Sequence, residues 1–183
     1  QVKPGDTVAV FGCGGVGINV VQMSALFGAD VIAVDLDNQK LAMAKEMGAK
    51  HTINPKEVEK VPKRIREIVA GVGADIAFEV IGNPVTIRTA YESVRRGGRV
   101  VVVGYSDKEV SISPARLMFF EIEMIGSLGC RPVDYLTIIR LAHSGRLKIS
   151  PLITGRFPLE RINDALDTLR QGRGIRNIVT FPS

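Results

Sequence analysis

Four glycines fall within the six residues 12–17, between a β-branched run and a long apolar segment. The run TVAVFG at residues 7–12 has the composition of a buried strand. Residues 15–28 carry apolar side chains on most sides, as a helix buried against a sheet does. Glycine loses more conformational entropy on folding than any other residue, so such a cluster indicates a turn that excludes side chains. The chain is therefore expected to begin with a strand, a tight turn and a helix.

The same alternation of short apolar runs and helical patterns continues to about residue 129. The expected further strands cover residues 30–35, 51–53, 74–82, 98–105 and 121–129, and the expected further helices cover residues 38–48, 56–70 and 85–97. Strands that are apolar on both faces are typical of parallel sheets covered by helices on both sides. The pattern predicts an α/β fold with a doubly wound, six-stranded parallel sheet of the Rossmann type.

Beyond residue 129 the alternation changes. A helix, an extended segment, a second helix and a final strand are expected at residues 133–144, 151–157, 158–171 and 176–181. We expect residues 1–128 to form the sheet domain and residues 129–183 to form a C-terminal α/β extension. The first residue is Gln1 rather than Met, and we expect further sequence to precede it.

The composition of the chain argues against nucleic acids and membranes as binding partners. The net charge is +5, but the basic residues are scattered and the chain has no Trp and only three Tyr, so we expect no nucleic-acid binding. No apolar run approaches the roughly 20 residues of a membrane-spanning helix, and no secretory signal is present, so we expect no membrane association. Two cysteines are too few for a disulfide framework, and we expect a reducing, cytoplasmic location.

Gly12, Gly14 and Gly17 satisfy the pattern G-x-G-x-x-G at the junction of the first strand and the first helix. In a βαβ unit the first glycine permits the tight turn, the second lets a pyrophosphate approach the backbone, and the third lets helix and strand pack closely. The phosphates would lie on unpaired N–H groups at the positive end of the helix. We interpret the turn as a dinucleotide site; the alternative is a glycine turn without a ligand.

Asp35 ends the second expected strand, eighteen residues after Gly17. A carboxylate at this place can accept hydrogen bonds from the adenosine ribose hydroxyls and would repel a 2′-phosphate, so we expect NAD rather than NADP. The alternative is that Asp35 caps the helix beginning at residue 38, which Asp37 or Asn38 could do equally well. Lys40 could reach the ribose, or it could be an ordinary exposed lysine.

Val80 and Ile81 end the fourth expected strand, and Val103, Gly104 and Tyr105 end the fifth. Ligands of doubly wound sheets lie beyond the carboxyl ends of the strands. We expect both segments to face one crevice, where their apolar character suits a nicotinamide ring. The alternative is that both are simply strand-to-helix turns, and the two interpretations can hold together.

Taken together, these segments resemble the medium-chain, zinc-containing alcohol dehydrogenases, and the resemblance covers nearly the whole chain. VKPGDTVAVFGCGGVG resembles the entry into the family's cofactor domain, VIAVDLDNQKLAMAKEMGA its second strand and helix, FEVIG its fourth strand and GGRVVVVG its fifth. PLITGRFPLERINDALDTLRQGRGIRNIVTF resembles the family's C-terminal segment. The combination of these segments is more specific than any single motif.

The resemblance implies a set of contacts with NAD. The implied residues are Gly14, Gly15 and Val16 at the pyrophosphate, Asp35 and Lys40 at the ribose, Ile81, Val103 and Tyr105 beside the nicotinamide half, and Arg176 at the pyrophosphate. The alternative for Arg176 is a surface arginine. Asn83 stands where some members of the family carry an arginine, which puts a cofactor contact from that position in doubt.

The zinc ligands of the family have no counterpart in the sequence. In the family the catalytic zinc is bound in an N-terminal domain, typically by a Cys₂His-type set with an open fourth position. His51 and His143 are the two histidines, and neither has a cysteine at a metal-ligand spacing. We therefore expect no catalytic and no metal-binding residue in this chain. Zinc is expected only in a catalytic domain that residues 129–183 would join.

The resemblance implies the NAD-binding portion of an alcohol or polyol dehydrogenase, which transfers a hydride between an alcohol and NAD. The chain alone is expected to be inactive, and the full-length enzyme is expected to act on a small alcohol, polyol or carbonyl compound. A homodimer or homotetramer is expected through the apolar edge segment EIEMIGSL at residues 121–128. The alternatives are a zinc-free quinone or enoyl reductase of the same superfamily and a non-catalytic NAD-sensing module.

Overall fold

The computed structural model describes residues 1–181. The chain forms two compact units, Gln1–Cys130 and Arg131–Ser183. The first unit contains a six-stranded parallel sheet, and the second contains a two-stranded parallel sheet. No helix within residues 1–181 combines the length and the apolar character needed to cross a membrane.

The sheet of the first unit has the strand order β3-β2-β1-β4-β5-β6. Its strands are β1 (Thr7–Phe11), β2 (Asp30–Val34), β3 (His51–Ile53), β4 (Ala74–Glu79), β5 (Val94–Val102) and β6 (Glu123–Gly126). Its helices are α1 (Gly17–Leu26), α2 (Asn38–Glu46), α3 (Val61–Ile68), α4 (Pro84–Ser93) and α5 (Pro114–Phe119). The prediction of a doubly wound, six-stranded Rossmann sheet is confirmed.

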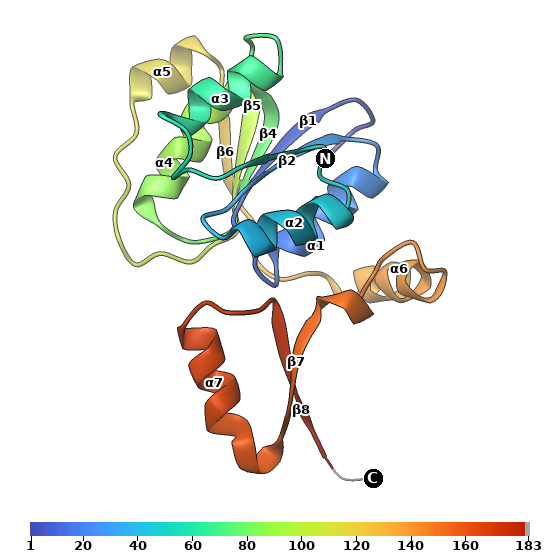
Figure 1. Ribbon diagram of the computed structural model, residues 1–183. Coiled ribbons are helices and arrows are strands. Elements are labelled where there is room, and N and C mark those ends of the chain that lie inside the picture. The colour runs from blue at the N-terminus through green and yellow to red at the C-terminus, as the bar shows by residue number, and fades with distance from the viewer. Residues whose placement is uncertain (182–183) are drawn as a thin grey trace. The chain divides into compact units, whose positions relative to one another are not determined.

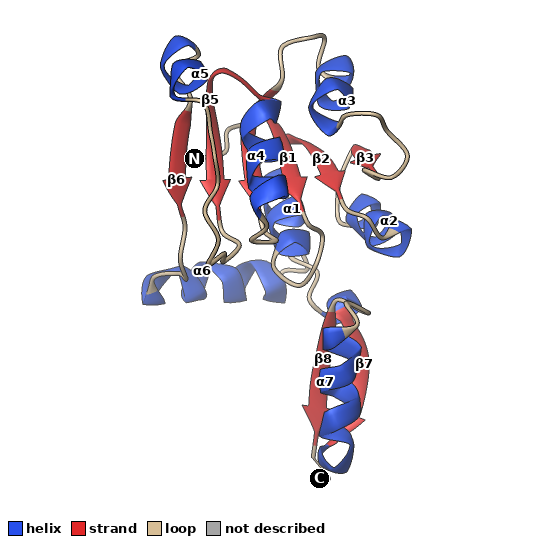
Figure 2. Ribbon diagram, turned by 90° about the vertical axis from the view of Figure 1, so that its left-hand side faces the viewer, coloured by secondary structure: helices blue, strands red, loops and turns tan. Residues whose placement is uncertain are grey.

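Helices cover both faces of this sheet, with α1 and α2 on one side and α3 and α4 on the other (Figures 1 and 2). Successive side chains of a strand point to opposite faces of the sheet, and both faces of the central strands are buried. Ala9 and Phe11 of β1 share a buried cluster with Ile65 of α3 and Tyr91 of α4. The intervening Val10 is also fully buried, on the opposite face of the strand. Both faces of the central strands are therefore apolar, as parallel sheets require.

The strand order reverses direction between β1 and β4. Their pairing runs from Val8 beside Ile76 to Phe11 beside Glu79. Because the strands are parallel, the turns that follow β1, β2, β4 and β5 all lie at the carboxyl edge of the sheet. In doubly wound folds this edge, at the point where the strand order reverses, is where ligands bind.

Two predicted helices have different bounds in the structure. The helix expected at residues 56–70 is α3, which begins only at Val61, with Pro62 in its first turn. The helix expected at residues 85–97 is α4, which ends at Ser93, and the next four residues already belong to β5. Gly97 there adopts a φ of +64°, which ordinary residues rarely adopt in a helix or strand.

The region between β5 and β6 also differs from expectation. The short helix α5 was not predicted; Ser113 caps it by accepting a hydrogen bond from the Arg116 N–H at 3.3 Å, and Pro114 occupies its first turn. The strand expected at residues 121–129 is the four-residue β6, which lies at one edge of the sheet.

The second unit is a small α/β arrangement. Its elements are α6 (Pro132–His143), β7 (Ile153–Pro158), α7 (Ile162–Arg170) and β8 (Arg176–Thr180), with 3₁₀ turns at Ser150–Leu152 and Leu159–Arg161. β7 and β8 pair in parallel. Leu152, Ala165 and Ile175 are its buried apolar residues near this pair.

Candidate dinucleotide site

The glycine-rich turn between β1 and α1 depends on two glycines for its shape. Gly12 has a φ of +95°, and a Cβ there would lie 2.6 Å from Cγ1 of Ile81. A Cβ on Gly17 would lie only 1.7 Å from the carbonyl oxygen of Gly12. These two positions exclude side chains because the start of α1 packs directly against the end of β1, as the glycine pattern predicts.

Gly14 is different, because nothing lies within 4 Å of the position its Cβ would take. The protein therefore leaves open space beside this residue. Within residues 1–181, the backbone N–H groups of Gly14, Gly15 and Val16 donate to no acceptor of the protein. Val16 is the N-cap residue of α1, and its side chain caps nothing. A row of unpaired N–H groups at the positive end of a ten-residue helix is suited to an anion such as a pyrophosphate.

Asp35 lies beside this turn, at the end of β2. Its Oδ2 accepts a hydrogen bond from the Cys13 N–H at 2.7 Å, and its Oδ1 accepts one from the Asp37 N–H at 3.0 Å. Asp37 caps α2, because its side chain accepts from the Gln39 N–H at 2.8 Å. The capping role considered for Asp35 therefore belongs to Asp37. The half-exposed Asp35 carboxylate keeps further acceptor capacity for a ligand hydroxyl.

The charges around the turn act on Cys13, whose side chain is fully buried. Burial, together with the negative charge of Asp35, raises the pKa of the Cys13 thiol to about 12. The Val34 carbonyl and the positive charge of Lys40 oppose this rise. Lys40 is half-buried on α2, close enough to the turn for its charge to act there. The buried, neutral thiol is consistent with Cys13 as a small packing residue.

The turns after β4 and β5 form a second part of this edge. Val80 continues the sheet, because its N–H donates to the Phe11 carbonyl at 2.9 Å. Ile81 beyond it is 50% exposed, and Tyr105 after β5 is 87% exposed. Val103 and Gly104 are half-buried. The structure therefore places two large exposed side chains at the carboxyl edge, and that of Ile81 lies next to Gly12.

The backbones of these two turns are in direct contact. A Cβ on Gly82 would lie 1.9 Å from the Tyr105 carbonyl oxygen, and a Cβ on Gly104 would lie 2.0 Å from the Gly82 nitrogen. The carbonyl of Glu79 accepts from the N–H groups of Val103 and Gly104 at 2.8 and 3.0 Å. Asn83 caps α4, because its side chain accepts from the Val85 N–H at 2.9 Å.

Glu79 is a residue that the sequence interpretation missed. It ends β4 and is 0% exposed. Its Oε1 accepts from the Ile81 N–H at 3.1 Å and from the Gly82 N–H at 3.0 Å, and the Thr86 hydroxyl lies 2.7 Å from the same oxygen. The available signal was an acidic residue at the last position of the strand ADIAFE, directly before a turn with glycine.

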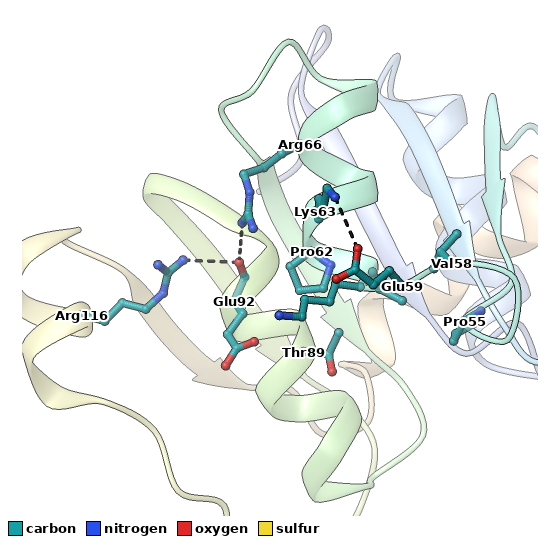
Figure 3. Close-up of a pocket in the computed structure, with 11 residues that line it drawn as sticks. Pro55, Val58, Glu59, Pro62, Lys63, Arg66, Thr89, Glu92 and Arg116 are labelled. Atoms are coloured by element: carbon teal, nitrogen blue, oxygen red, sulfur yellow. Dashed lines mark hydrogen bonds and ion pairs between the residues drawn. The ribbon is translucent and has the colours of Figure 1, made fainter.

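A separate hollow of about 610 Å³ lies among α3, α4 and α5 (Figure 3). Arg66 and Arg116 both donate to the Glu92 carbonyl across it, at 3.2 and 3.3 Å. This carbonyl is in the last turn of α4, where helical partners are missing, so the two arginines complete the helix end. Lys63 pairs with Glu59 at 3.4 Å at the rim. None of the turns after β1, β2, β4 and β5 lines this hollow, and the two arginines that cross it act at the end of α4.

Comparison with known proteins places the geometry in a family. The sequence profile of the zinc-binding dehydrogenases matches residues 15–144. The chain belongs to the zinc-binding dehydrogenase family. This assignment agrees with the resemblance drawn from the sequence segments.

Individual members of the zinc-binding dehydrogenase family support the match. An S-(hydroxymethyl)glutathione dehydrogenase of Photobacterium damsela subsp. piscicida is 33% identical over 99% of this chain and 51% of its own length. An alcohol dehydrogenase of Geobacillus stearothermophilus is 36% identical over 93% of this chain and 49% of its own length. The crystal structure of 2R,3R-butanediol dehydrogenase from Bacillus subtilis superposes with a TM-score of 0.90 at 31% identity, covering 100% of this chain and 52% of that one. The chain thus spans about half the length of these relatives.

Zinc gives the zinc-binding dehydrogenase family its name. Within residues 1–181, no three His, Cys, Asp or Glu side chains form a group that could hold a metal ion. His51 and His143 are both exposed, on β3 and at the end of α6. Arg176 is exposed on β8 in the second unit, where its N–H donates to Thr154 Oγ1 at 3.2 Å. The proposed contact of Arg176 with a pyrophosphate stays a prediction.

Proposed function

We propose that the chain binds NAD(H) as the cofactor portion of a zinc-type alcohol or polyol dehydrogenase. The observation that carries this proposal is the row of unpaired N–H groups at Gly14, Gly15 and Val16 at the start of α1, with open space beside Gly14. A dinucleotide matches the site at two places, because its pyrophosphate can accept from this row of N–H groups and its ribose hydroxyls can donate to the neighbouring Asp35 carboxylate. Membership of the zinc-binding dehydrogenase family supports the same conclusion.

Asp35 supports the choice of NAD over NADP. Its carboxylate is already fixed by the Cys13 and Asp37 N–H groups, so it cannot turn away from the ribose without losing these bonds. A fixed carboxylate can accept from the ribose hydroxyls of NAD, whereas a 2′-phosphate would meet a like charge. Lys40 lies close enough to offset part of that repulsion, but it does not remove the carboxylate.

In the proposed reaction the residues of this chain bind and orient the cofactor. The nicotinamide, when bound, supplies the hydride acceptor or donor. Ile81 and Tyr105 offer exposed surface against which a nicotinamide can lie, and Val103 and Gly104 directly precede Tyr105 and are half-buried. The described residues do not fit a zinc ion, so we derive no step through zinc from this chain. In the proposal, zinc and the small alcohol, polyol or carbonyl substrate bind in a catalytic domain outside it.

Features of the second unit support the proposal that this chain binds the cofactor and that a separate catalytic domain binds zinc and substrate. Val133, Leu136 and Ile139 are exposed apolar residues of α6, and Leu166 and Leu169 are exposed on α7. Apolar surfaces of this kind commonly mark contacts with further protein. We propose that residues 129–183 pack against the catalytic domain, which corresponds to the half of the relatives that this chain does not match.

The edge strand β6 supports self-association into a homodimer or homotetramer. It pairs with β5 on one side only and is the last strand of the sheet. Ile125 on this strand is 45% exposed, and Leu128 just beyond it is fully exposed. An open apolar edge favours pairing with a second copy, and a two-fold contact would place the same strand on both sides.

A cytoplasmic location is proposed on the basis of cysteine chemistry. Cys13 and Cys130 are both free thiols, the first buried and the second exposed. An exposed free thiol suits a reducing compartment.

Two measurements on the chain test the proposed function. Isothermal titration calorimetry with NADH is expected to show saturable binding of one molecule per chain. A steady-state assay with a panel of alcohols and NAD is expected to show no turnover, because the chain assembles no metal site within its described residues. Absence of NADH binding would contradict the cofactor role. Zinc-dependent turnover by this chain would contradict the proposal that zinc and substrate bind in a separate catalytic domain.

A further inference from the structure

Glu79 is the one acidic or basic residue within residues 1–181 whose side chain lies in the protein interior. A buried carboxylate is costly unless hydrogen-bond donors surround it. It lies at the last paired position of β4, between Phe11 of β1 and Val102 of β5. This position is at the carboxyl edge, immediately beside the switch point of the sheet.

The donors to this carboxylate all come from the segment that follows β4. Gly82 donates its N–H to both carboxylate oxygens, at 3.0 and 3.1 Å, and Ile81 donates its N–H at 3.1 Å. The Thr86 hydroxyl lies 2.7 Å from the carboxylate and 2.9 Å from the Asn83 carbonyl. Its single proton favours the carboxylate, because an ionised acceptor makes the stronger bond. One side chain therefore fixes the whole turn between β4 and α4.

The main chain of the same residue fixes the neighbouring turn. The Glu79 carbonyl accepts from both Val103 and Gly104, and the backbone of Gly104 lies against that of Gly82. Ile81, held through its N–H, lies against Gly12 of the glycine-rich turn. A change in the turn after β4 would therefore displace the turn after β5. Ile81 touches the glycine-rich turn only at Gly12, and the N–H groups of Gly14 and Val16 make no hydrogen bond with either turn among the described residues.

We propose that Glu79 is a positioning residue for the cofactor. Its buried carboxylate holds the turn after β4, and through it the turn after β5, in the shape that receives the second nucleotide half of the dinucleotide. This inference rests on the proposed binding of NAD(H). In a doubly wound sheet each half of the strand order receives one mononucleotide, and β4 and β5 belong to the half that does not contain the glycine-rich turn.

A purely structural role predicts a different pattern of binding. If Glu79 only stabilised the domain, its loss would lower the thermal stability and leave binding by the folded protein unchanged. If Glu79 positions the second half of the site, its loss weakens ligands that reach this half and spares those that do not. NADH reaches both halves, and ADP reaches only the half with the glycine-rich turn and Asp35.

The experiment measures the dissociation constants of NADH and ADP by calorimetry for the parent chain and for Glu79→Gln. Glutamine keeps the size of the side chain but places an NH₂ group against the Gly82 N–H. We expect NADH binding to weaken by about tenfold or more, and ADP binding by less than about threefold, because bonds to a charged acceptor are the ones lost. Glu121→Gln, an exposed glutamate before β6, is the matched control and is expected to leave both constants unchanged.

A second variant decides the matter if Glu79→Gln does not fold. Thr86→Val removes only the hydroxyl donor and is expected to weaken NADH binding by about threefold relative to ADP. Thr86→Ser keeps the hydroxyl donor and should therefore keep the parent's ratio of NADH to ADP affinity. Thr89→Val is the control one turn later on α4, since the Thr89 hydroxyl donates to the Val85 carbonyl and not to Glu79.

The outcomes separate this inference from the proposed function. An unchanged ratio of NADH to ADP affinity in folded Glu79→Gln or Thr86→Val overturns the positioning role while the parent still binds NADH. Equal weakening of both ligands gives such an unchanged ratio and overturns the role too, because the loss is then not confined to the second half of the site. A parent chain that binds neither ligand contradicts the proposed function itself, and the positioning role is then overturned with it.

Discussion

Replacement of Gly14 and Gly17 by alanine separates ligand binding from folding within one turn. A Cβ at Gly14 meets nothing within 4 Å, and the residue has no positive φ. A Cβ at Gly17 overlaps the Gly12 carbonyl oxygen at 1.7 Å. The first substitution therefore fills only the space reserved for a ligand, and the second forces the start of α1 away from the end of β1.

The expected magnitudes follow from this geometry. Overpacking typically costs about 1–3 kcal/mol, and an overlap with backbone cannot be relieved by a change of rotamer, so Gly17→Ala should lie in the upper part of this range. The gain in helix propensity of about 1 kcal/mol offsets only part of that cost. Gly14→Ala should change the free energy of unfolding by no more than about 0.5 kcal/mol. It should nevertheless weaken NADH binding by about tenfold or more, since hydrogen bonds to a charged phosphate contribute about 1.5–3 kcal/mol each.

Thermal unfolding and calorimetric titration with NADH on both variants provide the test. Gly126→Ala on β6 is the control, because its Cβ also meets nothing within 4 Å and the residue has no positive φ. We expect this control to leave both properties unchanged. Gly14→Ala with the stability and the NADH affinity of the parent would refute the assignment of this turn to the pyrophosphate.

Three further predictions follow from the same site and its sheet. In the parent, we expect NADH to bind about a hundredfold or more tightly than NADPH, and Asp35→Asn, which keeps the shape of the side chain but removes its charge, should reduce this preference. Equal affinities of the parent for the two cofactors would disprove the assignment of Asp35 to the ribose. Ile125→Lys combined with Leu128→Lys should shift the sedimentation profile toward monomer, and an unchanged profile with folding preserved would exclude the β6 edge as the interface. The raised pKa of Cys13 predicts that stability is fully present below pH 9 and falls as the pH rises toward about 12, by up to about 1.4 kcal/mol per pH unit, because the unfolded thiol ionises first. Urea titrations between pH 8 and 10.5 on the parent and Cys13→Ala should show a steeper fall in the parent, while Cys130 reacts with iodoacetamide in the folded state and Cys13 does not.

The fold was predictable from the sequence because the order of apolar strands and amphipathic helices can be seen in the local spacing of apolar residues. The valine-rich runs, such as residues 100–103, are apolar on both faces, and each is separated from the next by a segment of helical length. The parallel, doubly wound arrangement follows from that alternation alone. The bounds around residues 94–97 did not follow, because two arginines and a glycine are not typical of a strand, and their place in β5 is set by pairing with β4 across a register shift.

The glycine-rich turn and Asp35 were predictable because residue type and spacing both matter there. The two hydrogen bonds that fix the Asp35 carboxylate could not be predicted. Their donors are the backbone N–H groups of Cys13 and Asp37, and every residue except proline carries such a group. Glu79 was missed for the same reason. A glutamate at the end of a strand suggests exposure to water, and only the three-dimensional structure shows the N–H groups of Ile81 and Gly82 turned back onto it.

The central claim is that a dinucleotide binds at the carboxyl edge of the six-stranded sheet, with its phosphates on the N–H groups at the start of α1. Amide nuclear magnetic resonance spectra of the ¹⁵N-labelled chain, recorded during titration with NADH, test this claim most directly. The account predicts the largest shift changes at the amides of Gly14, Gly15 and Val16, with smaller changes at Asp35 and in the turns after β4 and β5. Shift changes that are absent from Gly14–Val16, or that centre on the hollow among α3, α4 and α5, would contradict it.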